Sequence, residues 1–445
     1  MPSTVRRPAL ALLLSACTLI AGAALGAPVG TAQPAPVRVA QPANCENRLS
    51  PPPPVDTSEQ VPDGTKPPSP LPVPETPVGG ERMAECGLVQ SPNAKPAPDQ
   101  VTAAGWVLAD MDSGVVLAAK DPHGRQRPAS VMKVLLAMVV AKELPLDTTV
   151  VATQEDVDQE CTCVGLRDGG EYTVEQLMQA LLMMSGNDVA HTLARRLGGV
   201  PSAVRKMTAL AAELGALDTR AITPSGLDAP GTSTSAYDVA VIFRAAMKYP
   251  EFAKAISTPQ ISFPARSGRG TIQVVNDNLL LGNYEGALGG RAGFTDDALN
   301  TYVGAAERGG KRLVVALLRG TQEPVPIVDQ AAALLDHGFE LQGSEGVGKL
   351  VDGAPQPKKK TTEPKPTETS AAPGAPKGNS SAGNRLTAGK TPMEAAFGNV
   401  GLPITGVAAL GVVLGLLMYL RTRRAKAARA RRAAEQEAKL AQLGL

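Results

Sequence analysis

Residues 125–144 read RQRPASVMKVLLAMVVAKEL, and from Val134 to Leu144 nearly every residue is apolar. This run predicts a helix that is buried on most of its sides. Ser130 and Lys133 stand three residues apart at its start, on one face of the first turn. A serine oxygen there lies near the positive end of the helix dipole, and a lysine partly removed from water has a lowered pKa and can accept the serine proton. Taken alone, the tetrad also fits a capping serine followed by an exposed lysine.

Two further short motifs carry polar or cationic groups. Ser185, Gly186 and Asn187 form a break between two predicted helices and place a hydroxyl and an amide two residues apart. Residues 291–293, Arg-Ala-Gly, follow two glycines in a predicted strand, where glycine lets a ligand approach the backbone closely. Three chemically complementary motifs in one chain favour a catalytic site over separate structural features.

The order of predicted elements indicates an α+β fold. A hairpin is expected over 105–120 and another over 300–318, around two consecutive glycines, and the chain returns to strand after Gly286. Helices are expected from Ser130 and over 173–184, 188–198, 201–215, 235–250 (with Ser235 as N-cap) and 325–341. Strands at both ends with helices between them predict that the terminal strands share one antiparallel sheet.

The three motifs resemble those of the penicillin-binding protein and serine β-lactamase superfamily, which are S-x-x-K, S-x-N and K-T-G. They read SVMK, SGN and RAG here. The segments GRQRPAS, TVEQLMQALLMMSGNDVA and TSTSAYDVA look more specifically like secreted actinobacterial D-alanyl-D-alanine carboxypeptidases, which are low-molecular-weight penicillin-binding proteins. The resemblance covers about residues 100–340 and implies a transpeptidase-like antiparallel sheet flanked by helices.

By this resemblance, Ser130 attacks the peptide bond between two D-alanines of a peptidoglycan stem peptide. Lys133 would be its base, and Ser185 would relay the proton to the leaving D-alanine. The substrate would be held by Asn187 and by the third motif, and backbone amides of Ser130 and Phe294 would form the oxyanion hole. Water would then hydrolyse the acyl-enzyme without a cofactor, and β-lactams would acylate the same serine.

The third motif departs from the family pattern. Arg291 keeps the charge of the usual lysine in a wider, planar group, and Ala292 lacks the hydroxyl expected to bind the substrate carboxylate, beside the retained Gly293. Loss of such a hydrogen bond costs about 1–3 kcal/mol. A catalytically weak pseudoenzyme is therefore one alternative. A serine β-lactamase is another, although it would need a further carboxylate to activate water, which the sequence does not locate.

Composition bears on nucleic-acid binding, metal binding and the redox compartment of the protein. The formal net charge of +2 gives no general case for nucleic-acid binding. The three histidines and the CTC segment show no zinc-ligand spacing, so no metal is expected. Without Cys17, four cysteines remain, Cys45, Cys86, Cys161 and Cys163, an even number that suits an oxidising compartment; all three pairings stay open.

The chain ends indicate export and anchoring. Expected segments are a signal peptide (1–27), a Pro-rich extended spacer (28–99), the peptidase domain (100–344), a low-complexity linker (345–395), a transmembrane helix (400–420) and a basic cytoplasmic tail (421–445). A lipoprotein cleavage box at Cys17 is the alternative at the N-terminus. LPITG at 402–406 resembles a sortase signal, so wall attachment is the alternative to a membrane anchor. Either reading places the domain outside the cytoplasm.

Overall fold

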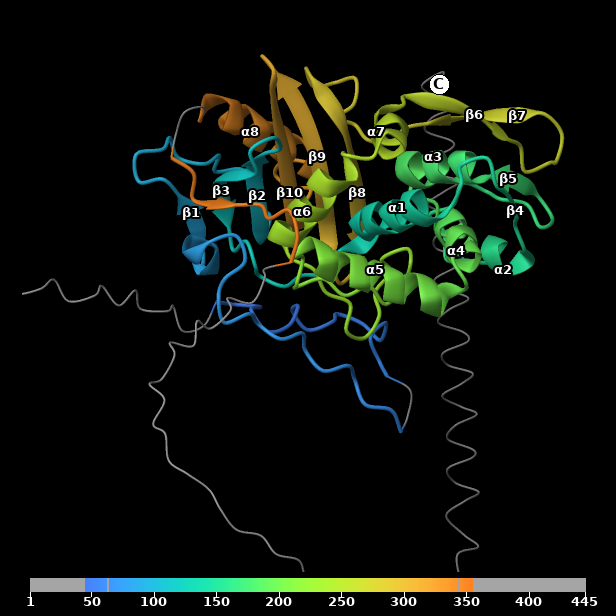
Figure 1. The fold of residues 1–445 in the computed structure, drawn as a ribbon, viewed down its shortest axis with the longest axis horizontal. Helices are drawn as coiled ribbons and strands as arrows, with labels where there is room; N and C mark the ends of the chain where they lie inside the picture. The colour runs from blue at the N-terminus through green and yellow to red at the C-terminus, as the bar shows by residue number, and fades with distance from the viewer. Residues whose placement is uncertain (1–44, 62–63, 342–344, 355–445) are drawn as a thin grey trace, which may run out of the picture. The chain divides into compact units, whose positions relative to one another are not determined.

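The computed structural model describes residues 45–61, 64–341 and 345–354, and its centre is an antiparallel sheet (Figure 1). The strand order is β1-β3-β2-β10-β9-β8, with β11 also paired to β3. The strands are β1 (Leu88–Gln90), β2 (Gly105–Asp110), β3 (Val115–Lys120), β8 (Ala287–Thr295), β9 (Leu299–Arg308), β10 (Lys311–Gly320) and β11 (Gly348–Lys349).

Pairing of β2 with β10 joins the two ends of the domain, as the sequence predicts. The register places Trp106 opposite Leu317 and Leu108 opposite Val315. Both expected hairpins are present: β2–β3 turns at the Asp-Ser-Gly segment and β9–β10 turns at Gly309 and Gly310. The two glycines have φ angles of 57° and 74°, which suit a tight turn. The predicted α+β antiparallel architecture is confirmed.

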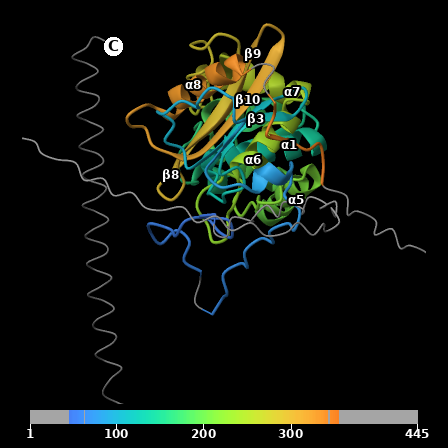
Figure 2. The same cartoon turned by 90° about the vertical axis from the view of Figure 1, so that its left-hand side faces the viewer.

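Helices cover both faces of the sheet. The main helices are α1 (Met132–Glu143), α3 (Val174–Met184), α4 (Asn187–Arg196), α5 (Val200–Leu214), α6 (Ala236–Ala246), α7 (Pro250–Ser257) and α8 (Ile327–Glu340). Figure 2 shows α8 on one side of the sheet and α6, α1 and α5 on the other. Ser235 caps α6 by accepting a hydrogen bond from the backbone N–H of Asp238, as predicted.

Helix α1 lies at the centre of the helical layer. Every residue from Met132 to Val140 is buried, because α3, α4, α5, α6 and α7 all pack against it. A helix that is apolar all round is stable only in such surroundings. The first turn of α1, which carries Lys133, is therefore held inside the domain.

The helical layer also contains short elements that were not predicted. They are the helix α2 (Gln154–Val157), the hairpin of β4 (Thr149–Val151) and β5 (Glu171–Thr173), and the hairpin of β6 (Gln260–Pro264) and β7 (Thr271–Val275). The β6–β7 hairpin projects at the far end of the domain in Figure 1. These elements are too short for hydrophobic periodicity to reveal them.

The folded part starts before residue 100 and continues past 344, which corrects the expected boundaries. Strand β1 pairs with β3, and Val89 and the preceding Met83 are fully buried. We call residues 45–61 and 64–77 the N-terminal strap, which is tied to the domain by a Cys45–Cys86 disulfide. The second disulfide joins Cys161 and Cys163.

The strap lies along the domain because buried arginines bind its carbonyl groups. Arg125 donates hydrogen bonds to the carbonyls of Leu49, Leu71 and Pro72, at 2.8, 2.6 and 2.9 Å. Arg127 likewise donates to Pro52 at 2.7 Å. A proline-rich segment buries little apolar surface, so these polar contacts, which composition cannot reveal, supply its attachment.

Several predictions fall on other parts of the chain. The signal peptide, most of the low-complexity linker, the span 400–420 and the basic tail 421–445 lie outside the described residues. Within the described residues, no helix has the length and apolar character needed to cross a bilayer.

Candidate active site

Ser130 sits in a single 3₁₀ turn, η2 (Ala129–Val131), that leads directly into α1. The residue before it, Ala129, has a φ of 48°, an uncommon conformation for a residue with a side chain. Gly226 fits this turn closely, since a Cβ on it would lie 1.9 Å from the Ala129 carbonyl oxygen. A strained backbone of this kind persists only where its surroundings fix it, and such places are often functional.

Lys133 reaches the predicted nucleophile. Its Nζ lies 2.8 Å from Ser130 Oγ and donates a hydrogen bond to the Ser225 carbonyl at 2.9 Å. The side chain is fully buried, and this burial, reinforced by the positive charge of Arg291, holds the pKa of Lys133 well below its usual value. A neutral amine next to a serine hydroxyl is the arrangement that general-base catalysis needs.

The second motif lies where α3 ends and α4 begins. Ser185 caps α3 in a left-handed conformation, with φ 62°, and its buried Oγ has no hydrogen-bond partner among the described residues. Asn187 donates from Nδ2 to the Glu160 carbonyl at 2.6 Å, while its buried Oδ1 has no partner in the same part of the chain. Unpartnered buried polar atoms are rare in folded proteins, and both are available to a substrate.

Strand β8 brings the third motif to the same place. Gly293 packs on the nucleophile turn, since a Cβ on it would lie 2.6 Å from the backbone nitrogen of Ser130. Thr301, its partner on β9, donates a hydrogen bond to the Pro128 carbonyl at 2.9 Å. The sheet and the turn thus fix the position of the Ser130 amide, which is one of the two amides expected in the oxyanion hole.

Arg291 is not free to receive a substrate carboxylate in this structure. Its side chain is 3% exposed, and Nη2 lies 2.5 and 2.6 Å from the two carboxylate oxygens of Asp277. Nη1 and Nε donate to the carbonyls of Leu182 and Ala292. The observed role of Arg291 is to tie β8 to the end of α3 and to add positive charge near Lys133.

Ala292 and Phe294 alternate with Arg291 and Gly293 along β8. Ala292 packs against the apolar cluster beneath α8, on the opposite face of the strand from the two residues that approach the catalytic pair. Phe294 is 59% exposed and lines a cavity together with Asn187. The predicted amide of Phe294 therefore belongs to a residue at the mouth of the site.

Three groups that shape the site were missed from the sequence. The Ser225 carbonyl binds Lys133, and Asp277 and Asp188 both raise the Lys133 pKa against the larger effect of burial. Asp188 also accepts backbone hydrogen bonds from residues 164, 165 and 166, which hold the loop of the Cys161–Cys163 disulfide. Asp188 could have been predicted from the sequence, because it directly follows the second motif. Ser225 and Asp277 lie in loops that carry no local sequence signal.

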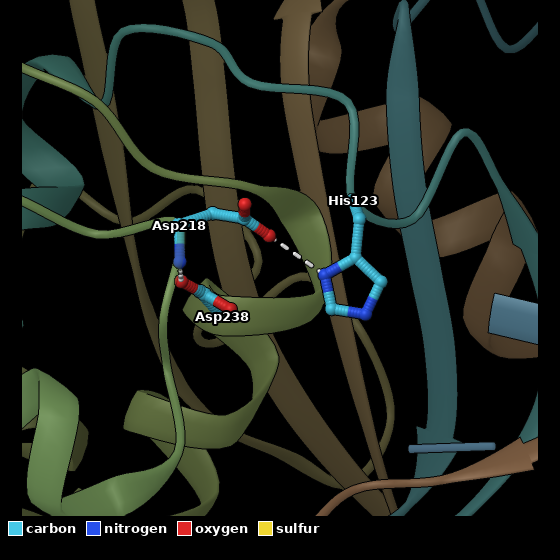
Figure 3. A group of neighbouring side chains, drawn as sticks. All are labelled: His123, Asp218 and Asp238. Carbon is cyan, nitrogen blue, oxygen red and sulfur yellow. Dashed lines mark hydrogen bonds and ion pairs between the residues drawn. The ribbon is translucent and has the colours of Figure 1, made fainter. Parts of the chain in front are cut away.

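One group of side chains has the composition of a metal site, but its donor atoms are engaged (Figure 3). His123 Nδ1 lies 2.7 Å from Asp218, and its Nε2 lies 3.0 Å from the Val78 carbonyl. Arg125 donates to the other oxygen of Asp218 at 2.9 Å, and Asp238 accepts from the Asp218 N–H at 2.7 Å. Since both ring nitrogens face oxygen atoms, this buried cluster acts as a polar anchor beneath the strap.

A family model described as D-alanyl-D-alanine carboxypeptidase (Peptidase_S11) matches residues 91–321, more than half of the chain. The chain belongs to the D-alanyl-D-alanine carboxypeptidase family. This confirms the family predicted from the three motifs. The members of this family are serine-type carboxypeptidases. None of the comparisons supports the pseudoenzyme alternative.

Relatives in this family include D-alanyl-D-alanine carboxypeptidase DacB2 of Mycobacterium tuberculosis, which is 50% identical over 266 residues that cover 59% of this chain and 90% of the relative. DacF of Bacillus subtilis is 28% identical and is covered over 61% of its length. The solved D-alanyl-D-alanine carboxypeptidase of M. tuberculosis H37Rv has a TM-score of 0.57 at 48% identity, covering 59% of this chain and 100% of that chain. The Streptomyces K15 DD-transpeptidase has a TM-score of 0.53 at 27% identity, covering 55% and 100%.

Proposed function

We propose that this protein removes the terminal D-alanine from peptidoglycan stem peptides through an acyl-enzyme formed on Ser130. The observation that carries the proposal is the 2.8 Å contact between Ser130 Oγ and the buried Nζ of Lys133. The chemistry of stem-peptide hydrolysis needs a nucleophile and a base in this relation, and membership of the carboxypeptidase family supplies the substrate class.

In this mechanism the neutral amine of Lys133 takes the proton of Ser130 as Oγ attacks the carbonyl carbon between the two D-alanines. The resulting oxyanion is stabilised by the backbone amides of Ser130 and Phe294. Ser185 passes the proton to the leaving nitrogen, so that the carbon–nitrogen bond breaks and free D-alanine departs. Water then attacks the ester carbonyl and gives a proton to the Lys133 amine. As the bond between the acyl carbon and Oγ breaks, Lys133 passes that proton to Ser130 Oγ, and the shortened peptide leaves with a new carboxylate.

The same geometry predicts acylation by β-lactams, because the strained lactam carbonyl is attacked in the same way as the peptide carbonyl. We expect labelled penicillin to attach covalently to the full-length protein. We also expect a peptide ending in D-Ala-D-Ala to release D-alanine, measured in the same preparation. Failure of both reactions would contradict the proposed function.

We further propose that the domain acts outside the cytoplasm and is held at the membrane by residues 400–420. The support is the sequence: 21 mostly apolar residues reach across a bilayer, and the arginine-rich tail that follows favours the cytoplasmic side. Two disulfides in the described residues fit an oxidising compartment. Detergent should release the full-length protein from cells; release only by wall-degrading enzymes would favour the sortase alternative.

A further inference from the structure

A second cavity, of about 520 Å³, lies between the N-terminal strap (blue in Figure 1) and the body of the domain. The strap side carries Arg48, Leu49 and a series of prolines, and the body side carries Arg220 and residues 231–233. Cavities of this volume accommodate small organic molecules. The described residues that line it include none of those assigned to the active site, so it is a separate feature of the molecule.

The charge at this cavity is positive. Its charged lining residues are Arg48, Arg125, Arg127, Arg220 and Glu59. Arg125 is paired with Asp218, and Arg127 is paired with Glu59. Arg48 and Arg220 form no ion pair with any residue that the structure describes. Two of the guanidinium charges therefore lack a balancing carboxylate.

Backbone carbonyls hold the two unpaired arginines in place. Arg220 donates from Nε to the Gly231 carbonyl at 2.7 Å and from Nη1 to the Ser69 carbonyl at 2.9 Å. Arg48, on the strap, donates from Nη1 to the His123 carbonyl at 3.3 Å. The Nη2 groups of both arginines have no acceptor in the described part of the chain. Fixed guanidinium groups with free N–H donors are suited to binding an oxyanion.

The positive charges are close enough to affect one another. Burial, together with the charge of Arg125, lowers the pKa of Arg220. Burial also lowers the pKa of Arg48, where the charge of Arg125 acts in the same direction and that of Asp218 opposes it. Because an arginine stays protonated in a protein, both shifts reflect an electrostatic cost that the folded chain carries. A bound anion would reduce this cost.

A separate observation points to a ligand in the same cavity. Thr232 and Ser233 line it, are 2% and 4% exposed, and their side-chain oxygens have no hydrogen-bond partner among the described residues. The backbone fixes both residues: the Arg220 N–H donates to the Ser233 carbonyl at 2.9 Å, and the Thr232 N–H donates to the Ala229 carbonyl at 3.0 Å. Buried hydroxyls without partners are rare, and a hydroxyl can turn its proton toward an acceptor that enters the cavity.

These donors suit a phosphate group better than a carboxylate. A carboxylate has two oxygen atoms in one plane, whereas a phosphate presents three acceptor oxygens that donors on the strap and on the body can reach together. A phosphate alone fills only part of a cavity of about 520 Å³, whose lining also includes Leu49 and prolines. The ligand should therefore carry its phosphate on a carbon skeleton, and Asn47 and Ser50 in the lining can bind hydroxyl groups on that skeleton.

We propose that this cavity binds a phosphate ester of a polyol, such as a glycerol phosphate or a sugar phosphate. Arg48 and Arg220 bind the phosphate charge, and the hydroxyls of Thr232 and Ser233 donate to its oxygens. Because Arg48 belongs to the strap and the other three residues to the body, the ligand joins these two parts of the chain. A free ester and a lipid headgroup share this chemistry. The site is independent of the proposed carboxypeptidase function.

Isothermal titration calorimetry of the full-length protein in a non-ionic detergent tests the site with sn-glycerol 3-phosphate. We expect a dissociation constant of about 1 mM or lower. D-Glycerate, which has a carboxylate on a similar skeleton, should bind at least about fivefold more weakly, and glycerol should not bind. Addition of phosphatidylglycerol to the micelles distinguishes the sources: competition with the soluble ester indicates a lipid headgroup, and unchanged affinity indicates a free ester.

Two arginine variants test the charged contacts. Arg48→Gln and Arg220→Gln should each weaken binding about tenfold or more, because each removes hydrogen bonds to a charged group. The matched control is Arg205→Gln, which removes an exposed arginine of α5 outside the cavity and should leave the affinity unchanged. Every variant should be acylated by labelled penicillin at the unmodified rate, which shows that it is folded.

Thr232→Val separates a hydroxyl that binds a ligand from one with a structural role. The variant keeps the shape of the side chain and removes an unpartnered buried hydroxyl, so the protein without ligand should be at least as stable in urea as the unmodified protein. Its affinity for sn-glycerol 3-phosphate should nevertheless fall about fivefold. Lower stability with unchanged affinity would overturn the assignment of this hydroxyl.

Three results would overturn the site as a whole. They are no binding of sn-glycerol 3-phosphate up to about 10 mM, equal affinities for the ester and D-glycerate, and unchanged affinity in both arginine variants. Penicillin acylation in the same samples keeps the two proposals apart. Acylation without ester binding counts against this site alone, and ester binding without acylation counts against the carboxypeptidase function alone.

Discussion

Arg291 Nη2 lies 2.5 and 2.6 Å from the two carboxylate oxygens of Asp277, in an ion pair beside the buried Lys133. This pair turns the altered third motif into part of the electrostatic environment of the general base. Arg291 lowers the pKa of Lys133 and Asp277 raises it, and both act in addition to the larger effect of burial. The reactivity of Ser130 therefore depends on residues that do not touch it.

Opposite pH shifts are expected when the two members of this pair are neutralised. Arg291→Gln removes a positive charge, so the pKa of Lys133 rises and less neutral amine is present at a given pH. The acid limb of penicillin acylation, plotted against pH, should move to higher pH. Asp277→Asn removes a negative charge, so the pKa falls and the limb should move to lower pH. Arg291→Lys is the control that keeps the charge, and its shift should be smaller; limbs that move together would contradict this account.

Lys133→Ala should slow acylation of Ser130 by about 10²- to 10⁴-fold, because the proton of the hydroxyl then has no positioned base. Stopped-flow measurement with labelled penicillin gives the rate. Lys142→Ala, on the exposed end of the same helix, is the control and should react normally. Ser130→Ala should form no covalent adduct at all. Near-normal acylation of the Lys133 variant would remove this lysine from the mechanism.

Gly293→Ala should impair acylation through the backbone. The added Cβ would lie 2.6 Å from the Ser130 nitrogen and 3.0 Å from the Ala129 Cβ, so β8 and the nucleophile turn must separate. Loss of one oxyanion-hole donor costs about 10²- to 10³-fold in rate. Gly353→Ala, where the nearest atom to the added Cβ is 3.6 Å away, should be close to neutral. Equal acylation rates in the two variants would show that the β8 contact is not needed.

Asp238 should make the protein less stable as pH rises from about 4 towards 7. Burial, together with the charge of Asp218, raises the pKa of Asp238 from the ordinary range of an aspartate to about 7. The folded state then holds a proton that the unfolded state releases, so this contribution to stability is complete below about pH 4 and is lost as pH approaches 7. Urea titrations give the free energy of unfolding at pH 5 and at pH 8. The decrease in this free energy between the two pH values should be about 2 kcal/mol smaller in Asp238→Asn than in the unmodified protein. The same pH dependence in both would exclude a protonated Asp238.

The elements with strong local signals could be predicted from the sequence. The glycine pair 309–310 and the Asp-Ser-Gly turn predict their hairpins because few residues suit such turns. The apolar run after Lys133 predicts a buried helix, since hydrophobicity on all sides has no other stable placement in a globular domain. The proximity of Ser130 and Lys133 could also be predicted locally, because residues three positions apart along a helix lie on the same face.

Only the tertiary structure decided which residues from distant parts of the chain contact one another. Lys133, Asn187 and Arg291 bind groups in loops that lie 92, 27 and 14 residues away along the chain, and no sequence period links them. The strap is the plainest case: a proline-rich composition predicts an extended spacer, yet Arg125 and Asp297 bind its backbone and hold it at the site. Backbone carbonyls and amides are present in every sequence, so the contacts that satisfy them are determined only when the chain is folded.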